Sequence, residues 1–178
     1  MNYFVLFILW GVVFLAQISI APLFSFYGAS PNLIFAFFIA SVLFLKNKKF
    51  VFVSAIAAGI FAGFPSLLPA PAHIFAFSAL ALILFLTEKL LDDSVKKIFV
   101  LTAAFPLSFV YQISLSIFSL FFSFFGTRSP ITLNFESIFN RAVPAEAFLN
   151  FSATLIFYLS ILFFKRGRER FLKIFPIF

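Results

Sequence analysis

The sequence predicts an all-α fold: a polytopic membrane protein of about six transmembrane helices in one bundle, with the N and C termini cytoplasmic. The 178-residue chain is 63% hydrophobic and only 11% charged, with a mean hydropathy of +1.15. A soluble domain has about 25% charged residues, so this chain cannot cover its surface with polar groups. Its apolar residues also fall into long runs separated by short loops, and its basic residues lie almost entirely in alternate loops.

Residues 1–178 are predicted to form a single integral-membrane domain, because no linker or repeat divides them. A span needs about 20 apolar residues. The run over 32–45 falls short of this length, so it could extend backward through Tyr27-Gly28, tilt, or be re-entrant. The run over 98–125 exceeds it and could tilt strongly or break near Pro106. The expected spans lie near residues 3–21, 27–45, 50–68, 73–87, 98–125 and 147–164.

The orientation follows from the excess of basic residues in cytoplasmic loops. Lysines follow the second and fourth runs, and five basic residues follow the sixth in a tail that fits a surface-lying anchor on an anionic leaflet. Only Arg128 and Arg141 fall on the other side, so an even number of spans satisfies the pattern. The cytoplasmic set is Lys46, Lys48, Lys49, Lys89, Lys96, Lys97, Lys165, Arg166, Arg168, Arg170 and Lys173.

Several function classes are disfavoured. The net charge of +7 does not indicate nucleic-acid binding, because the basic residues lie between apolar runs. The chain lacks cysteine, so it has no thiolate metal site, and it lacks the common hydrolase, zinc-protease and phosphate-loop motifs. The single histidine, His73, is predicted to be interfacial with no special role. We expect no enzymatic activity, no catalytic or metal-binding residue and no cofactor, and the lack of mid-span charges disfavours a pump.

The fifth run carries polar residues on one helix face. Ser108, Gln112, Ser116, Ser119 and Ser123 recur at spacings of three or four, which places them in one row. In lipid such a row turns toward protein or toward a cavity, because hydroxyls and amides need hydrogen-bond partners. Helix packing is the simplest interpretation. A partner-binding seam and the wall of a ligand cavity are the alternatives.

The third run carries small residues in register, and small residues let helix backbones approach closely. Internal packing is the expected use, with docking to another membrane protein as the alternative. One row is Ser54, Ala58 and Ala62, and the adjacent row is Ala55, Gly59 and Gly63.

Polar residues also mark two helix starts. Glu146 and Asn150 lie four apart at the start of the sixth run, where an acidic group in the first turn favours a helix beginning near Pro144. Gln17 lies inside the first apolar run, and Ser30-Pro31-Asn32 closes the following turn. Gln17 is expected to bond between helices or toward a partner's span, while proline fixes φ and asparagine either caps the next helix or forms the turn.

Taken together, these features resemble the MreD family of bacterial rod-shape-determining membrane proteins. In that family a Leu-Gln or similar pair precedes a small loop and a Pro-Asp-Leu motif. Asn32 departs from the usual aspartate, and the acidic residue that usually follows the Gly-rich segment is replaced by Phe64-Pro65-Ser66. The matching features are Ala16-Gln17, Pro31-Asn32-Leu33, the basic turn at Lys46–Lys49, the glycines of Gly59–Gly63, and Pro144 with Asn150.

The resemblance implies a non-catalytic, multi-pass scaffold of the bacterial cytoplasmic (inner) membrane, in contact with membrane lipid. Its partners would be an MreC-like single-span protein, the MreB-like filament and the cell-wall elongation machinery that synthesises peptidoglycan. The residues predicted for partner binding or helix packing are Gln17, Pro31, Asn32, Gly59, Gly63, Gln112, Ser116, Ser119, Glu146 and Asn150.

The main alternative is the substrate-binding (S) subunit of an energy-coupling-factor (ECF) vitamin transporter, which also has six spans and binds its vitamin in an outward cavity. Trp10, Tyr27 and Tyr111, with the polar face of the fifth run, could line such a cavity. Polar groups on the outer side look sparse, which disfavours it. A lipid-modifying enzyme or small exporter is a third possibility, weakened by the missing motifs.

Overall fold

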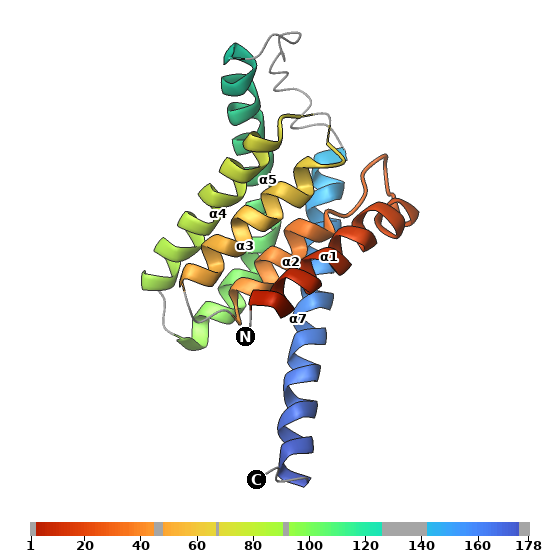
Figure 1. Cartoon of the computed structure of the whole chain (residues 1–178), viewed down its shortest axis with the longest axis vertical. Coiled ribbons are helices and arrows are strands. Elements are labelled where there is room, and N and C mark those ends of the chain that lie inside the picture. The colour runs from red at the N-terminus through yellow and green to blue at the C-terminus, as the bar shows by residue number, and fades with distance from the viewer. Residues whose placement is uncertain (1–2, 45–47, 67, 91–92, 126–141, 175–178) are drawn as a thin grey trace.

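The computed structural model consists of helices joined by turns in the residues that it describes, which are 3–44, 48–66, 68–90, 93–125 and 142–174 (Figure 1). In these segments the only β pairing is one isolated bridge, so the all-α prediction is confirmed for them. The elements are α1 (Tyr3–Ser19), the short 3-10 helix η1 (Ala21–Phe24), α2 (Leu33–Val42), α3 (Lys48–Gly63), α4 (Ala70–Leu90), α5 (Asp93–Phe125) and α7 (Ala142–Ile174).

Three of these helices are long and apolar enough to cross a membrane. They are α4 over Ala70–Thr87, α5 over Ile98–Phe124 and α7 over Val143–Phe164. The other three helices have apolar segments of 10–17 residues. The chain therefore has the composition and helix lengths of a membrane protein, while six complete spans and the orientation of the termini stay predictions.

In the region where a span was predicted over 27–45, the helix begins only at Leu33 and ends at Val42, so it does not extend backward through Tyr27-Gly28. Ten residues rise about 15 Å, half of a bilayer core of about 30 Å. Every side chain from Ile34 to Ser41 is buried, and α2 contacts α1, α3, α5 and α7. A helix that is apolar on all sides belongs inside other helices, so α2 is the central element of the bundle.

The chain enters α2 through a tight turn over Phe26–Ala29. The backbone N–H of Phe26 donates to the carbonyl of Ala29 at 2.7 Å, and the reverse bond measures 3.0 Å. Tyr27 and Gly28 both have positive φ, +51° and +77°, as a two-residue turn of the primed type requires. The apolar stretch that resembled the start of a span is therefore a reversal that leads into the buried Pro31.

The small residues of α3 pack against α4, as predicted. Ser54, Ala55 and Ala58 are fully buried. A Cβ built on Gly63 would lie 2.8 Å from the Cα of Ala70, and one on Gly59 would overlap the backbone of Ile74. Backbone contact this close is possible only without side chains, so the row that contains Gly59 and Gly63 is covered by α4 and is not free to dock another protein.

The two longest helices run without a break. α5 continues through Pro106, so the break considered there does not occur. α7 continues in one line from its apolar part to Ile174, and its C-terminal half extends beyond the bundle (Figure 1), where a separate surface-lying anchor was expected. Lys46, Arg128 and Arg141 lie outside the described residues, as does most of the loop expected before α7.

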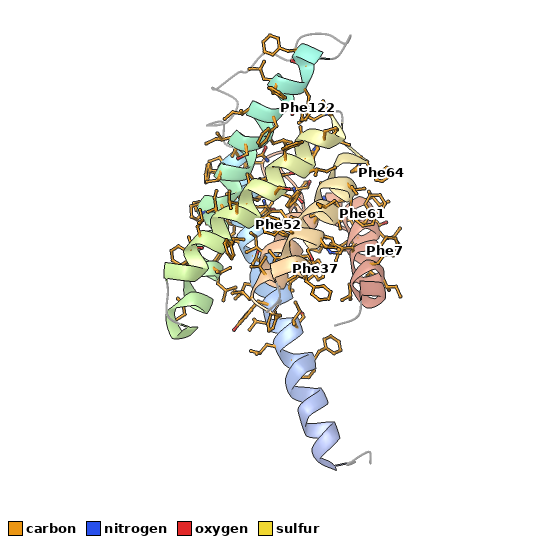
Figure 2. The ribbon with its side chains drawn as sticks, turned by 60° about the vertical axis from the view of Figure 1, so that its left-hand side comes forward. Phe7, Phe37, Phe52, Phe61, Phe64 and Phe122 are labelled. Atoms are coloured by element: carbon orange, nitrogen blue, oxygen red, sulfur yellow. The ribbon has the colours of Figure 1, made fainter. Side chains whose placement is uncertain are left out.

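Phenylalanine occupies both the core and the surface of the bundle (Figure 2). Phe37 meets the buried Trp10 edge to face at 4.9 Å, and Phe38 meets Phe77 in the same way at 5.4 Å, an arrangement that aromatic pairs prefer. Phe7 and Phe64 are instead 66% and 72% exposed. Exposed phenylalanine on this scale suits contact with lipid.

We expect Gly59→Ala to lower the free energy of unfolding by about 1–3 kcal/mol, because the new methyl group would push α3 away from the α4 backbone. Gly11→Ala is the matched control, since a Cβ there meets nothing within 4 Å, and it should raise stability by up to about 1 kcal/mol. Thermal unfolding of both variants in the same detergent measures the difference. Equal melting temperatures would contradict close α3–α4 contact.

Candidate functional site

The first turn of α2 is the meeting point of the polar side chains in this bundle. The first N–H groups of any helix lack partners within the helix. At the start of α2 these groups lie among other helices, where water is scarce. Asn32 caps the helix, its Oδ1 accepting from the N–H of Phe35 at 3.0 Å. Two further donors, the N–H groups of Asn32 and Leu33, are met from outside α2.

Gln17, near the end of α1, supplies one of these outside partners. The N–H of Leu33 donates to Gln17 Oε1 at 2.6 Å, and Gln17 Nε2 donates to the carbonyl of Pro31 at 3.3 Å. One amide therefore ties α1 to the entry of α2 through both of its polar ends. This agrees with the predicted interhelical bond and leaves the Gln17 oxygen engaged within the chain.

Asn150 of α7 supplies the second partner, from more than a hundred residues away. The N–H of Asn32 donates to Asn150 Oδ1 at 2.6 Å, and Asn150 Nδ2 donates to Ser108 Oγ of α5 at 3.2 Å. Ser108 in turn donates to the carbonyl of Ala104. Asn150 is fully buried, so one side chain joins α2, α5 and α7.

Glu146 lies one turn before Asn150 and faces α5. Gln112 Nε2 donates to Glu146 Oε2 at 2.9 Å. The amide side chain of Asn150 also bonds to this carboxylate. The predicted N-terminal capping by Glu146 is replaced by this bond between α5 and α7.

His73, which was predicted to be interfacial with no special role, is buried between helices. His73 is 5% exposed, and its Nδ1 shares a hydrogen bond of 2.9 Å with the hydroxyl of Tyr111. Its other ring nitrogen, Nε2, is buried and has no partner among the described atoms. Tyr111 also stacks obliquely on Phe77 at 4.9 Å, so the pair is fixed between α4 and α5.

Several of the polar residues described above line one pocket of about 310 Å³. It lies at the end of the bundle where α1 and α3 end and α2, α4 and α7 begin, which the charge pattern predicts to face outward. The expectation of sparse polar groups on this side is therefore wrong, since several helices each contribute one. The polar lining is Gln17, Ser30, Asn32, His73, Tyr111 and Glu146.

Two other predicted site residues of α5, Ser116 and Ser119, form no hydrogen bond to another helix among the described atoms. Ser116 donates to the carbonyl of Gln112 in its own helix, and Ser119 is buried with no partner among the described atoms. The polar row of α5 therefore reaches α7 only through Ser108 and Gln112. Of the aromatic residues proposed for a vitamin cavity, Tyr111 lines the pocket, Trp10 lies in the core and Tyr27 is exposed.

The described lining of the pocket can form hydrogen bonds with a ligand. The described residues contain no cluster of three His, Cys, Asp or Glu side chains that could hold a metal. Its lining instead offers amide, hydroxyl, imidazole and carboxylate groups for hydrogen bonds. Sequence reasoning overlooked the part played by His73, whose only signal was its place in the first turn of an apolar helix.

No protein-family model matches this chain, and neither the curated proteins nor the solved structures give a significant match. The function must therefore be argued from the residues themselves.

We expect Asn150→Leu and Gln17→Leu each to lower the free energy of unfolding by about 1–3 kcal/mol, because each leaves a buried backbone N–H of α2 without an acceptor. Ser152→Ala is the matched control, since its hydroxyl bonds only to Phe148 of its own helix, and should change stability by less than about 0.5 kcal/mol. Unfolding in detergent, followed by circular dichroism, gives the comparison. Unchanged stability in both leucine variants would show that the start of α2 is hydrated.

Proposed function

We propose that this protein is a non-catalytic scaffold of the bacterial cytoplasmic membrane, of the MreD type, that links an MreC-like single-span protein and an MreB-like filament to peptidoglycan synthesis. The proposal combines a membrane bundle whose described residues form no catalytic grouping with the resemblance carried by a small set of residues. The resemblance supports the proposal more strongly if these residues contact one another in the fold.

The observation that carries the proposal is their convergence. Gln17, the Pro31-Asn32-Leu33 segment and Asn150 were selected because they resemble family motifs, and they are far apart in the sequence. In the fold they form one hydrogen-bonded junction. Gly59 and Gly63 likewise occupy the close contact between α3 and α4. That these residues meet in one place supports a shared structural role for them, and the family's function is inferred from the resemblance that they carry.

A second candidate, the substrate-binding subunit of an ECF-type transporter, is favoured by a different observation. The pocket of about 310 Å³ is lined by polar groups on the side predicted to face outward. This volume is at the lower end of the usual range for ligand pockets, about 300–1,000 Å³. The two candidates differ in their partners, so association experiments separate them.

The test is co-purification of the tagged full-length chain, in mild detergent, with candidate partners encoded in the same genome. We expect it to retain an MreC-like protein, and to lose it when that partner's single membrane span is deleted, because contact within the bilayer requires the span. The transmembrane coupling subunit of an energy-coupling transporter serves as the competing partner in a parallel experiment.

Retention of the coupling subunit without the MreC-like protein would reverse the choice in favour of the transporter. Retention of neither would contradict both. Gly11→Ala, which alters a site with free space around it, is the control for the effect of substitution itself. It should bind as the unsubstituted chain does.

A further inference from the structure

We propose that the pocket beside the start of α2 binds a small organic cation that carries N–H donors, such as a primary ammonium group, with Glu146 and His73 as its principal contacts. This site is independent of the proposed scaffold function, because it lies inside the bundle and does not require a protein partner. The charge of the pocket lining, its unused hydrogen-bonding capacity and the volume of the pocket favour such a ligand.

The charge of the lining is one-sided. Among the described residues that line the pocket, Glu146 is the only Asp, Glu, Lys or Arg. Its described hydrogen-bond partners, the side chains of Gln112 and Asn150, are neutral amides. A carboxylate removed from water is costly unless it is paired. A cation in the pocket would provide that pairing, whereas an anion would be repelled.

His73 provides the second indication of a ligand. Its Nε2 is buried and has no partner among the described atoms, although the residue is only 5% exposed and lines the same pocket. The bond between Nδ1 and Tyr111 holds the ring in place. If Nδ1 carries the proton and donates to Tyr111, Nε2 is an unused acceptor. If the Tyr111 hydroxyl donates to Nδ1, Nε2 carries the proton and is an unused donor. Buried polar atoms are rarely left without a partner, so this nitrogen marks a place for a ligand atom.

The neighbouring groups are already occupied, which narrows what can bind. Both ends of the Gln17 amide bond to the backbone around α2, and Asn32 Oδ1 accepts from Phe35. These atoms shape the wall but offer little further capacity. The contacts that remain are therefore the Glu146 carboxylate, whose charge is met only by neutral amides among the described residues, and Nε2 of His73. A cation with more than one N–H can reach these groups while its carbon atoms meet Ile34 and Ala62.

The experiment titrates the full-length chain in lipid nanodiscs by isothermal calorimetry with four probes of similar size. Putrescine has charge and N–H donors, tetramethylammonium has charge without N–H, butanediol has neither charge nor N–H, and succinate has the opposite charge. We expect saturable binding of putrescine and at least tenfold weaker binding of the other three. Equal heats for putrescine and butanediol, or no saturable binding of any probe, would overturn the proposal.

Variants assign the contacts. Glu146→Gln keeps the side-chain shape and an acceptor for Gln112, and should weaken putrescine by about tenfold or more. His73→Phe should weaken it several-fold, because the ring remains and the nitrogen is lost. Glu88→Gln, the same change near the other end of α4, should leave affinity unchanged. An effect of Glu88→Gln equal to that of Glu146→Gln would mean that net charge alone attracts the probe, and would overturn the site.

One further arm tests whether the chain itself provides the cation. Arg141 is five residues upstream of Glu146 and lies outside the described residues. Binding of putrescine to the unsubstituted chain, unchanged in Arg141→Gln, supports a site for an external ligand. Binding that appears only in Arg141→Gln would show that an internal guanidinium already pairs with Glu146, and would overturn the proposal. Circular dichroism of each variant confirms that its helices are intact.

Discussion

The fold depends on one requirement: a short helix begins inside the bundle, and its first backbone N–H groups must be bonded there. α2 is too short to reach an aqueous boundary at both ends, and an unpaired N–H in an apolar medium costs several kcal/mol. The molecule meets the requirement with three amide side chains. Asn32 caps its own helix, while Gln17 and Asn150 reach in from α1 and α7.

Amides suit this task better than charged groups. An amide presents donor and acceptor together, so Gln17 serves an N–H and a carbonyl of the same turn, and Asn150 serves α2 with one end and Ser108 with the other. A carboxylate could accept these bonds but could not donate, and it would carry the cost of a buried charge. The helices around α2 are therefore held in register by neutral groups, while the close α3–α4 contact needs only the absence of side chains.

The sequence predicted the positions of most helices well, but it did not predict the short buried helix α2. The five helices outside α2 lie close to their expected ranges, because long apolar runs and proline or lysine boundaries are local signals. The small-residue rows of α3 also follow from helical spacing. The region 27–45 misled because an apolar run does not distinguish a span from a buried short helix preceded by a tight turn. The burial of His73 was not predicted, because it depends on how closely α5 approaches α4, and no local sequence pattern indicates that distance.

The same geometry that secures α2 produces the pocket. Because a turn, not a helix, precedes Leu33, the space beside the first turn of α2 is bordered by helix ends and by the loop over Gly28–Ser30. Side chains that line it without bonding α2, above all Glu146 and His73, keep capacity that the fold does not use. A purely structural junction could have been completed with Leu or Phe at these two positions at less cost. A carboxylate and an imidazole at these positions favour ligand binding over packing as their role.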